Sequence, residues 1–178
     1  MKSLSSVEGH LLALIWRFEP TTAYFVRKSL ESSLASDVSG SPGAVYPALQ
    51  RLKDRGFLTA VSAPDDGRRT EWISLTAQGG VMARKWVTEL ATSDQLPQDP
   101  LRTKIAFADL LDPEEARHWL IEAQALLVTE LEQLEAANAI DQPLATALAF
   151  DNAISLTSAR IAWLDRAVTR LRDDKAGS

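Results

Sequence analysis

One predicted helix, over residues 42–55, carries an unusual set of side chains on the side that should face away from the core. Near its start it has two small residues, Gly43 and Ala44, and one aromatic residue, Tyr46. Small residues let a backbone approach a partner closely, and the free N–H groups of a helix N-terminus attract phosphate. The chemistry that this pattern favours is therefore contact with double-stranded DNA, with the start of the helix in the major groove.

The two sides of this helix differ sharply in composition. At 100° per residue, the outer side also holds Gln50 and Arg51, whose side chains can hydrogen-bond to base edges or phosphates. Pro47 lies on the same side, although an interior proline costs a helix about 3 kcal/mol. We infer that something other than helix propensity shapes the segment. The opposite side is apolar and is the predicted core face: Val45, Ala48, Leu49 and Leu52.

Two adjacent arginines, Arg68 and Arg69, follow the turn sequence Pro-Asp-Asp-Gly. This turn separates two runs of strand-forming residues, FLTAVSA and RRTEWISL, and therefore predicts a two-stranded hairpin with the arginines at its tip. From there they can reach phosphates or a narrow minor groove. The alternative is that they pair in water with Asp65 and Asp66, which would contribute little energy.

The elements around the hairpin define a domain. Two segments with helical periodicity, SVEGHLLALIWRF and TTAYFVRKSLESSLA, precede the helix over 42–55. After the hairpin, Thr76 is the expected N-cap of a fourth helix over about 77–92. Four apolar residues of that helix are expected to pack inward: Val81, Trp86, Val87 and Leu90. The order helix, helix, helix, strand, turn, strand, helix predicts a winged helix-turn-helix with a two-stranded wing.

Charge and composition divide the chain in two. Its 178 residues carry a net charge of −5, but residues 1–90 hold 11 Lys and Arg against 9 Asp and Glu, whereas residues 91–178 hold 8 against 15. We predict a mainly α-helical protein with a DNA-binding winged-helix domain over 1–92 and a linker over 93–100. A C-terminal all-α helical dimerisation domain follows over 101–178.

Two apolar stripes mark the predicted helices of the C-terminal half. The spacing in the last helix alternates between three and four residues, as in a coiled-coil seam. A helical dimer would let two recognition helices read half-sites about 34–36 Å apart, so we expect the stripes to form a homodimer interface. The alternative is that they pack on each other within one chain. The stripe residues are Leu120, Leu127, Leu131 and Leu134, and then Phe150, Ile154, Ile161, Leu164, Val168 and Leu171.

Three aromatic residues in this half, Trp119, Phe150 and Trp163, are candidates to line a pocket for a small-molecule effector. The alternative is that they belong to an ordinary helical core, because aromatic residues at helical spacing commonly do. The sequence alone leaves both interpretations open.

The sequence gives little support for an enzyme. The chain has no cysteine, and its two histidines, His10 and His118, have no neighbours at the spacing of a metal site or a catalytic triad. We expect no metal and no cofactor. The N-terminal residues lack the apolar core of a signal peptide and no stretch is long enough to span a bilayer, so a cytoplasmic protein is expected, with no membrane association.

The segments SPGAVYPALQRLKDRGFL and GRRTEWISLTAQG resemble the signature of PadR-family transcriptional regulators. The matching positions are Tyr46, Pro47, Leu49, Leu52, Arg55, Gly56, Leu75, Thr76 and Gly79. The acidic C-terminal half is similar to the longer form of that family, whose extra helices form the dimer. One departure is Ala23-Tyr24, where the family often has Gly-Tyr.

The resemblance implies a sequence-specific transcriptional regulator, a repressor that binds a palindromic operator as a homodimer and can be released by a small molecule. It also implies that Ser41, Tyr46 and the two hairpin arginines contact DNA. Two other functions stay open. One is a MarR-like winged-helix regulator, and the other is a winged-helix protein-interaction module that does not bind DNA.

Overall fold

The computed structural model describes residues 4–32, 40–62, 70–90, 94 and 99–176. The chain divides into two compact units, residues 1–95 and residues 96–178. Each unit has its own cluster of buried hydrophobic residues. None of the helices in the described ranges is both long and apolar enough to cross a membrane.

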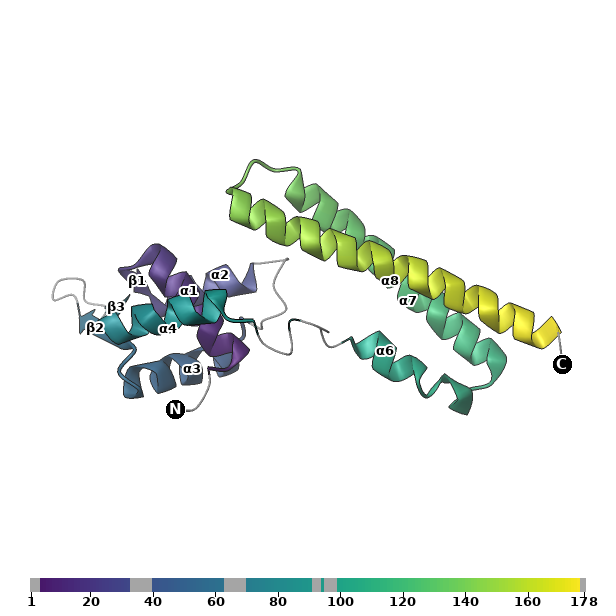
Figure 1. Ribbon diagram of the computed structural model, residues 1–178, viewed down its shortest axis with the longest axis horizontal. Coiled ribbons are helices and arrows are strands. Elements are labelled where there is room, and N and C mark those ends of the chain that lie inside the picture. Colours follow the sequence, from purple (N-terminus) through teal and green to yellow (C-terminus); the bar gives the residue numbers. More distant parts are fainter. Residues whose placement is uncertain (1–3, 33–39, 63–69, 91–93, 95–98, 177–178) are drawn as a thin grey trace. The chain divides into compact units, whose positions relative to one another are not determined.

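The N-terminal unit is the predicted winged helix-turn-helix (Figure 1). The sheet has three antiparallel strands in the order β1-β3-β2, whereas the sequence predicted only the hairpin of β2 and β3. The additional strand is two residues long, which is too short for a period of two to be recognised. The elements are α1 (Ser6–Phe18), β1 (Thr21–Thr22), α2 (Ala23–Glu31), α3 (Pro42–Asp54), β2 (Leu58–Ser62), β3 (Glu71–Leu75) and α4 (Ala77–Thr88).

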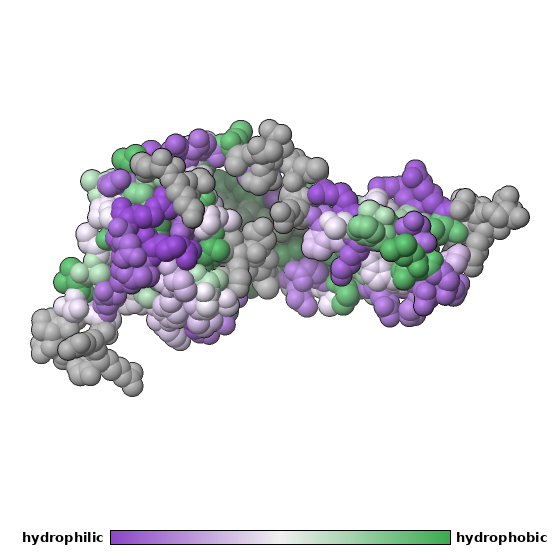
Figure 2. All heavy atoms as spheres, turned by 90° about the horizontal axis from the view of Figure 1, so that it is seen from below, coloured by the Kyte–Doolittle hydropathy of each residue, from purple (hydrophilic) through white to green (hydrophobic). Residues whose placement is uncertain are grey.

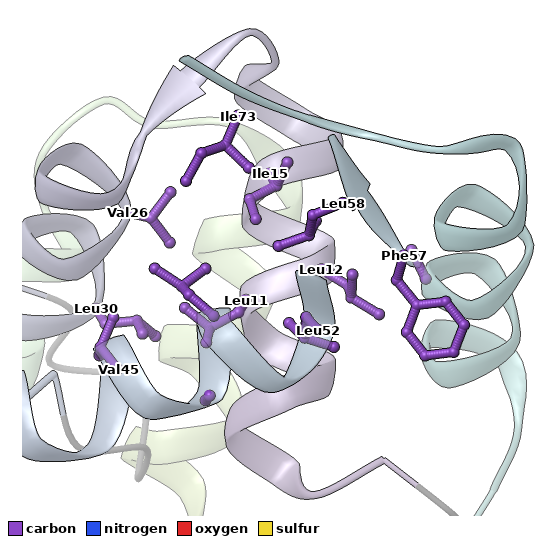
Figure 3. Packing of buried hydrophobic residues seen from close by; sticks show 13 residues of the cluster. Leu11, Leu12, Ile15, Val26, Leu30, Val45, Leu52, Phe57, Leu58 and Ile73 are labelled. Atoms are coloured by element: carbon purple, nitrogen blue, oxygen red, sulfur yellow. The ribbon is translucent and has the colours of Figure 1, made fainter. Parts of the chain in front are cut away.

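The core of this unit forms between α1 and the elements that surround it. The predicted core face of α3 is confirmed, since Val45, Ala48, Leu49 and Leu52 are all buried. Figure 3 shows the buried cluster of this unit, in which side chains from α1, α2, α3 and the sheet pack against one another. Burial of the apolar stripe fixes the opposite side of α3 as its outer side.

The turn after α3 connects it to the hairpin. Gly56 has a φ angle of 73°, a left-handed conformation that glycine adopts without steric cost. Immediately beyond it, the Phe57 N–H donates to the Leu52 carbonyl at 3.0 Å, and the Thr76 N–H donates to the Phe57 carbonyl at 3.0 Å. The end of α3 is thereby tied to the base of the wing.

Helix α4 begins as predicted but turns a different side inward. Thr76 is the N-cap, and its hydroxyl accepts from the Gly79 N–H at 2.9 Å. Val81 and Val87 are exposed, and Leu90 lies beyond the helix and is also exposed, so the prediction of inward packing was wrong for these three residues, whereas Trp86 is half-buried and its ring lies 5.6 Å from that of His10 in α1. The buried residues of α4 are the small Gly79 and Ala83, because the helix lies close against its neighbours.

The C-terminal unit is helical throughout its described part. It consists of α6 (Pro100–Ile105), a 3-10 turn η1 (Ala108–Leu110), α7 (Pro113–Asn138) and α8 (Leu144–Ala176). Helix α7 begins with a side-chain cap, because the Asp112 carboxylate accepts from the N–H groups of Glu114 and Glu115 at 2.9 Å each. Figure 1 shows α7 and α8 side by side in opposite directions.

The two apolar stripes of this unit meet each other inside one chain. Leu120 of α7 and Leu164 of α8 are completely buried in the same cluster, and Val168 is buried beside them. Leu134 and Phe150 are buried as well, while the remaining stripe residues are partly buried: Leu127, Leu131, Ile154, Ile161 and Leu171. The two stripes therefore pack on each other within one chain, as the alternative interpretation expected, and their part in a homodimer interface stays a prediction.

The surface of both units includes hydrophobic side chains among the hydrophilic ones (Figure 2). In the N-terminal unit, Phe18 and Phe25 are exposed and contact each other edge to face, with ring centroids 5.2 Å apart. In the C-terminal unit, several leucines of α7 and α8 are exposed, among them Leu126 and Leu148. These residues are available for contacts that the single chain does not make.

Candidate nucleic-acid interface

The outer side of α3 lies at the surface of the N-terminal unit. Gly43, Tyr46, Pro47 and Gln50 are exposed, and Tyr46 keeps 45% of its surface accessible. Ala44 is half-buried at the edge of this side. The structure thus brings the predicted helix residues together on one accessible face, which we call the α3 face.

The start of α3 presents backbone groups beside these side chains. The Ser41 carbonyl accepts from the N–H groups of Ala44 at 3.1 Å and Val45 at 3.0 Å, and the Ser41 side chain does not cap the helix. Pro42 occupies the first turn, where its missing N–H carries no cost. Pro47 lies inside the continuous helix and has no N–H to donate to the Gly43 carbonyl. The first turns of α3 are therefore shaped by small residues and proline rather than by side-chain caps.

Arg51 is held by a buried carboxylate at the start of α1. Its Nε donates to Glu8 Oε1 at 2.8 Å, and Arg55 Nη1 lies 3.4 Å from Glu8 Oε2. Glu8 also accepts from the Ser5 N–H at 3.0 Å, while its own N–H donates to the Ser5 hydroxyl at 3.2 Å. This capping box and the two arginines together fix α1 against α3.

The charge of Glu8 is stabilised in this position. Burial acts to raise the pKa of Glu8, but hydrogen bonds from the Arg51 side chain and the Ser5 backbone, with the charges of Arg51 and Arg55, hold it below its ordinary value of 4.5. Glu8 is therefore ionised at neutral pH, and Arg51 stays attached while 54% of its side chain remains exposed. Sequence reasoning did not identify Glu8, although Ser5 and Glu8 form the Ser-x-x-Glu pattern of a capping box.

Other polar residues near the α3 face are paired with one another. Gln50 Nε2 donates to Asp54 Oδ1 at 2.8 Å, one helical turn along α3. Lys53 pairs with Glu71 of β3, which links the helix to the wing. On α2, Glu31 pairs with both Arg27 and Lys28. The described surface around α3 is therefore of mixed charge, in agreement with the small positive balance of this half of the sequence.

Tyr24 of α2 is one of two adjacent aromatic residues on that helix. The structure exposes it, and the Arg27 guanidinium carbon lies 5.6 Å from the centre of its ring. The buried residues of α2 are Val26 and Leu30 instead. Its neighbour Phe25 is exposed as well, so neither aromatic residue of this short helix faces the core.

The wing is described only in its strands. Trp72 of β3 pairs with Val61 of β2 and with Thr22 of β1, so these three residues share one face of the sheet. Trp72 and Val61 are exposed. Arg68 and Arg69, the predicted tip contacts, lie outside the described residues.

Of the three aromatic residues predicted for an effector pocket, two lie against one buried cluster of the C-terminal unit and the third lies farther along α8. Trp163 lines a cavity of the C-terminal unit, and Trp119 packs on the same buried cluster. Phe150 lies on the same straight run of α8 as Trp163 but 13 residues earlier, which corresponds to about 20 Å along the helix. Among the described residues, no group of His, Asp and Glu is arranged to hold a metal ion.

Two protein-family models match the chain, one within each compact unit. Residues 11–85 match the transcriptional regulator PadR-like family, and residues 97–172 match the family described as virulence activator alpha C-term. No protein with a curated description matches the chain.

Several solved structures share this fold. Bacillus subtilis PadR in complex with operator DNA is 17% identical, with a TM-score of 0.80, and the match covers 96% of this chain and 99% of that one. Bacillus subtilis PadR in complex with p-coumaric acid is 18% identical, with a TM-score of 0.75 and coverage of 93% and 98%. The Vibrio cholerae virulence activator AphA is 18% identical, with a TM-score of 0.74 and coverage of 93% and 98%.

Proposed function

This chain belongs to the PadR-like family of DNA-binding transcriptional regulators, and we propose that it acts as a homodimer that represses transcription by occupying a palindromic operator. The α3 face enters the major groove of each half-site. The two arginines of the wing, Arg68 and Arg69, contact the backbone or the minor groove beside it.

The observation that supports this most directly is the accessibility of the α3 face. Its first turns expose Gly43 and Tyr46, and nothing in the described part of the N-terminal unit covers them. A helix end that is free of side-chain caps and lined by small residues can approach the base edges closely. Ser41, Ala44, Gln50 and Arg51 complete the proposed contact set of α3.

The homodimer is proposed from the exposed leucines of the helical unit. Leu126 of α7 and Leu148 and Leu156 of α8 are large apolar side chains at the surface, outside the stripes that pack within the chain. Burial of such residues against a second copy removes apolar surface from water. A two-fold pair then presents two α3 faces to two half-sites.

Release by a small molecule is part of the proposal. The structure of Bacillus subtilis PadR with p-coumaric acid supports a small-molecule effector for this chain as well. The effector is expected to shift the equilibrium toward a conformation of the dimer that does not fit the operator.

Selection of bound sites from random DNA tests the proposal. A dimer of this kind should enrich a palindrome whose half-sites are about one helical turn, or a multiple of it, apart. Enrichment of a single asymmetric half-site would contradict the homodimer, and absence of any enrichment would contradict sequence-specific binding.

Two further measurements distinguish the proposed repressor from an interaction module and from an activator. Titration of a random duplex at two salt concentrations should show a steep loss of affinity for a DNA-binding protein, whereas an interaction module should not bind. A reporter gene downstream of the selected site should be silenced by this chain. Increased expression would instead indicate an activator, as the virulence activator AphA is.

A further inference from the structure

One polar side chain of the α3 face is able to hydrogen-bond to the edge of a base at two points. Gly43, Ala44 and Pro47 have no polar side-chain atoms, and Tyr46 has a single hydroxyl. Gln50 has a carbonyl oxygen that accepts hydrogen bonds and an amino group that donates two. It is exposed about two helical turns beyond the start of α3. Gln50 is therefore the residue of this face best suited to distinguish one base from another.

The amide of Gln50 is oriented by a carboxylate one helical turn further along α3. Gln50 Nε2 donates to Asp54 Oδ1 at 2.8 Å, and both residues are exposed. At neutral pH an aspartate side chain only accepts hydrogen bonds, so the amide atom that faces it must be the nitrogen. Without such a partner, the amide could turn over and exchange the positions of its oxygen and its nitrogen. Asp54 thus sets which way round Gln50 presents them.

The position of Asp54 is not one that favours helix stability. Asp54 is the last residue of α3, where a negative charge interacts unfavourably with the helix dipole. A carboxylate near the α3 face would also repel the phosphates of a bound duplex. The hydrogen bond from Gln50 gives this carboxylate a role other than stability of the helix.

The groups that remain on Gln50 match one base. After the contact with Asp54, the amide retains one N–H and its oxygen, which are a donor and an acceptor side by side. Adenine presents the complementary pair in the major groove, with N7 as the acceptor and the N6 amino group as the donor. Guanine presents two acceptors there, N7 and O6, and the oriented Gln50 oxygen would face one of them without a hydrogen bond.

We propose that Gln50 reads an adenine in each operator half-site, and that Asp54 is the positioning residue that makes this contact selective. Oε1 of Gln50 accepts from adenine N6, and the second N–H of its Nε2 donates to adenine N7. The inference rests on the proposed function, in which the α3 face enters the major groove. It adds the identity of a base that each half-site must contain and the residue that selects it.

Fluorescence anisotropy of the full chain on its selected operator tests the proposal one base at a time. At one position of each half-site, replacing adenine by guanine should weaken binding about tenfold, which corresponds to about 1.4 kcal/mol. Replacing the same adenine by 7-deazaadenine, which lacks the N7 acceptor, should also weaken binding. Gln50→Ala should abolish both effects, while the base preferences at the other positions of the operator persist.

Asp54→Asn tests the positioning role. An asparagine side chain can accept or donate, so the Gln50 amide can then turn over, and guanine should be tolerated at the adenine position. The readout is the ratio of the affinities for the two operators, because loss of a negative charge alone changes the affinity for all duplexes together. Glu71→Gln is the matched control, since it removes a carboxylate that pairs with Lys53 of the same helix, and it should leave the ratio unchanged.

Two results would overturn the proposal while operator binding itself stands. One is an adenine preference that survives Gln50→Ala, and the other is an Asp54→Asn protein with the same ratio as the unmodified protein. Failure to select any site from random DNA would instead contradict the proposed function, and this inference with it.

Discussion

Arg51 Nε and Glu8 Oε1 are 2.8 Å apart, and they join the proposed DNA-contacting helix α3 to the first turn of α1. The carboxylate is almost fully buried, with 5% of the residue accessible, while the arginine is half-exposed. A guanidinium has five N–H donors, so contact through Nε leaves others for a phosphate. Glu8 thus orients Arg51, a member of the proposed DNA contact set.

The contribution of Glu8 to stability should depend on pH. The pKa of Glu8 is lower in the folded chain than in the unfolded one, so its contribution is present above the unfolded value of about 4.5 and is lost as the pH falls through the folded value. Glu8→Gln should lower the free energy of unfolding at pH 7 by about 1–2 kcal/mol. Urea denaturation at pH 7 and at pH 3 should show this difference shrinking at the lower pH. A difference that is constant with pH would show that the ionised carboxylate is not what stabilises this contact.

Removal of Arg51 should affect binding to every duplex in a similar way. If Arg51 contacts a phosphate, Arg51→Gln weakens binding regardless of sequence and reduces the slope of log affinity against log salt by about one. Arg55→Gln is the matched control, because Arg55 also contacts Glu8 but lies one turn further along, at the C-cap of α3, where its guanidinium carbon is 4.8 Å from the centre of the Phe57 ring. Fluorescence anisotropy at several salt concentrations measures the affinity and the salt slope of both variants. Equal slopes for the Arg51→Gln protein and the unmodified protein would remove Arg51 from the phosphate contacts.

Tyr46 should matter for DNA binding and little for stability. It is exposed on the α3 face, so Tyr46→Ala should reduce operator affinity while the thermal midpoint stays nearly unchanged. Leu49, three residues further along the helix, lies on the buried side, and Leu49→Ala should cost about 2–5 kcal/mol of stability. Calorimetry measures the stability of both variants, and fluorescence anisotropy measures their operator affinity. A large loss of stability on removing Tyr46 would place its ring in the core.

The features that were predicted correctly are those determined locally. The two sides of α3 follow from four apolar residues at helical spacing, and the cap at Thr76 follows from the residues next to the start of α4. The family resemblance, carried by the Tyr-Pro pair of α3 and the exit from the wing, was confirmed by the family model over residues 11–85.

The features that were missed depend on partners distant in the sequence. Glu8 and Arg51 are 43 residues apart, and no local pattern couples them. The inward side of α4 was predicted from its bulky residues, whereas the close approach of neighbouring backbone selects its small ones, Gly79 and Ala83. Likewise, apolar stripes at heptad spacing look alike whether they pair within one chain or between two, and only the structure shows Leu120 and Leu164 in one cluster.

The homodimer is best tested at an exposed leucine. Leu126 is 74% accessible in the single chain, so Leu126→Glu should leave the fold intact and yield monomers with reduced operator affinity. Leu164 is completely buried within the chain, and Leu164→Glu should instead unfold the helical unit. Light scattering gives the mass and circular dichroism the helix content. Ala136→Glu adds the same charge at another exposed position of α7 and should remain dimeric. Should Leu126→Glu also remain dimeric, Leu126 does not belong to the interface.

Two adjacent glycines of α4 provide a matched test of how closely this helix approaches the wing. A Cβ atom on Gly79 would lie 2.0 Å from the Phe57 carbonyl oxygen, whereas a Cβ on Gly80 would meet nothing within 4 Å. Each substitution by alanine gains helix propensity, about 1 kcal/mol at most. Gly80→Ala should therefore stabilise the N-terminal unit slightly, while Gly79→Ala should destabilise it by about 1–3 kcal/mol because backbone must move to relieve the clash. Thermal unfolding of the two variants measures the difference. The Phe57 carbonyl also accepts a hydrogen bond from the Thr76 N–H, which joins the end of α3 to the wing. Gly79→Ala should therefore reduce operator affinity as well. Equal stability of the two variants would show that α4 does not pack this closely.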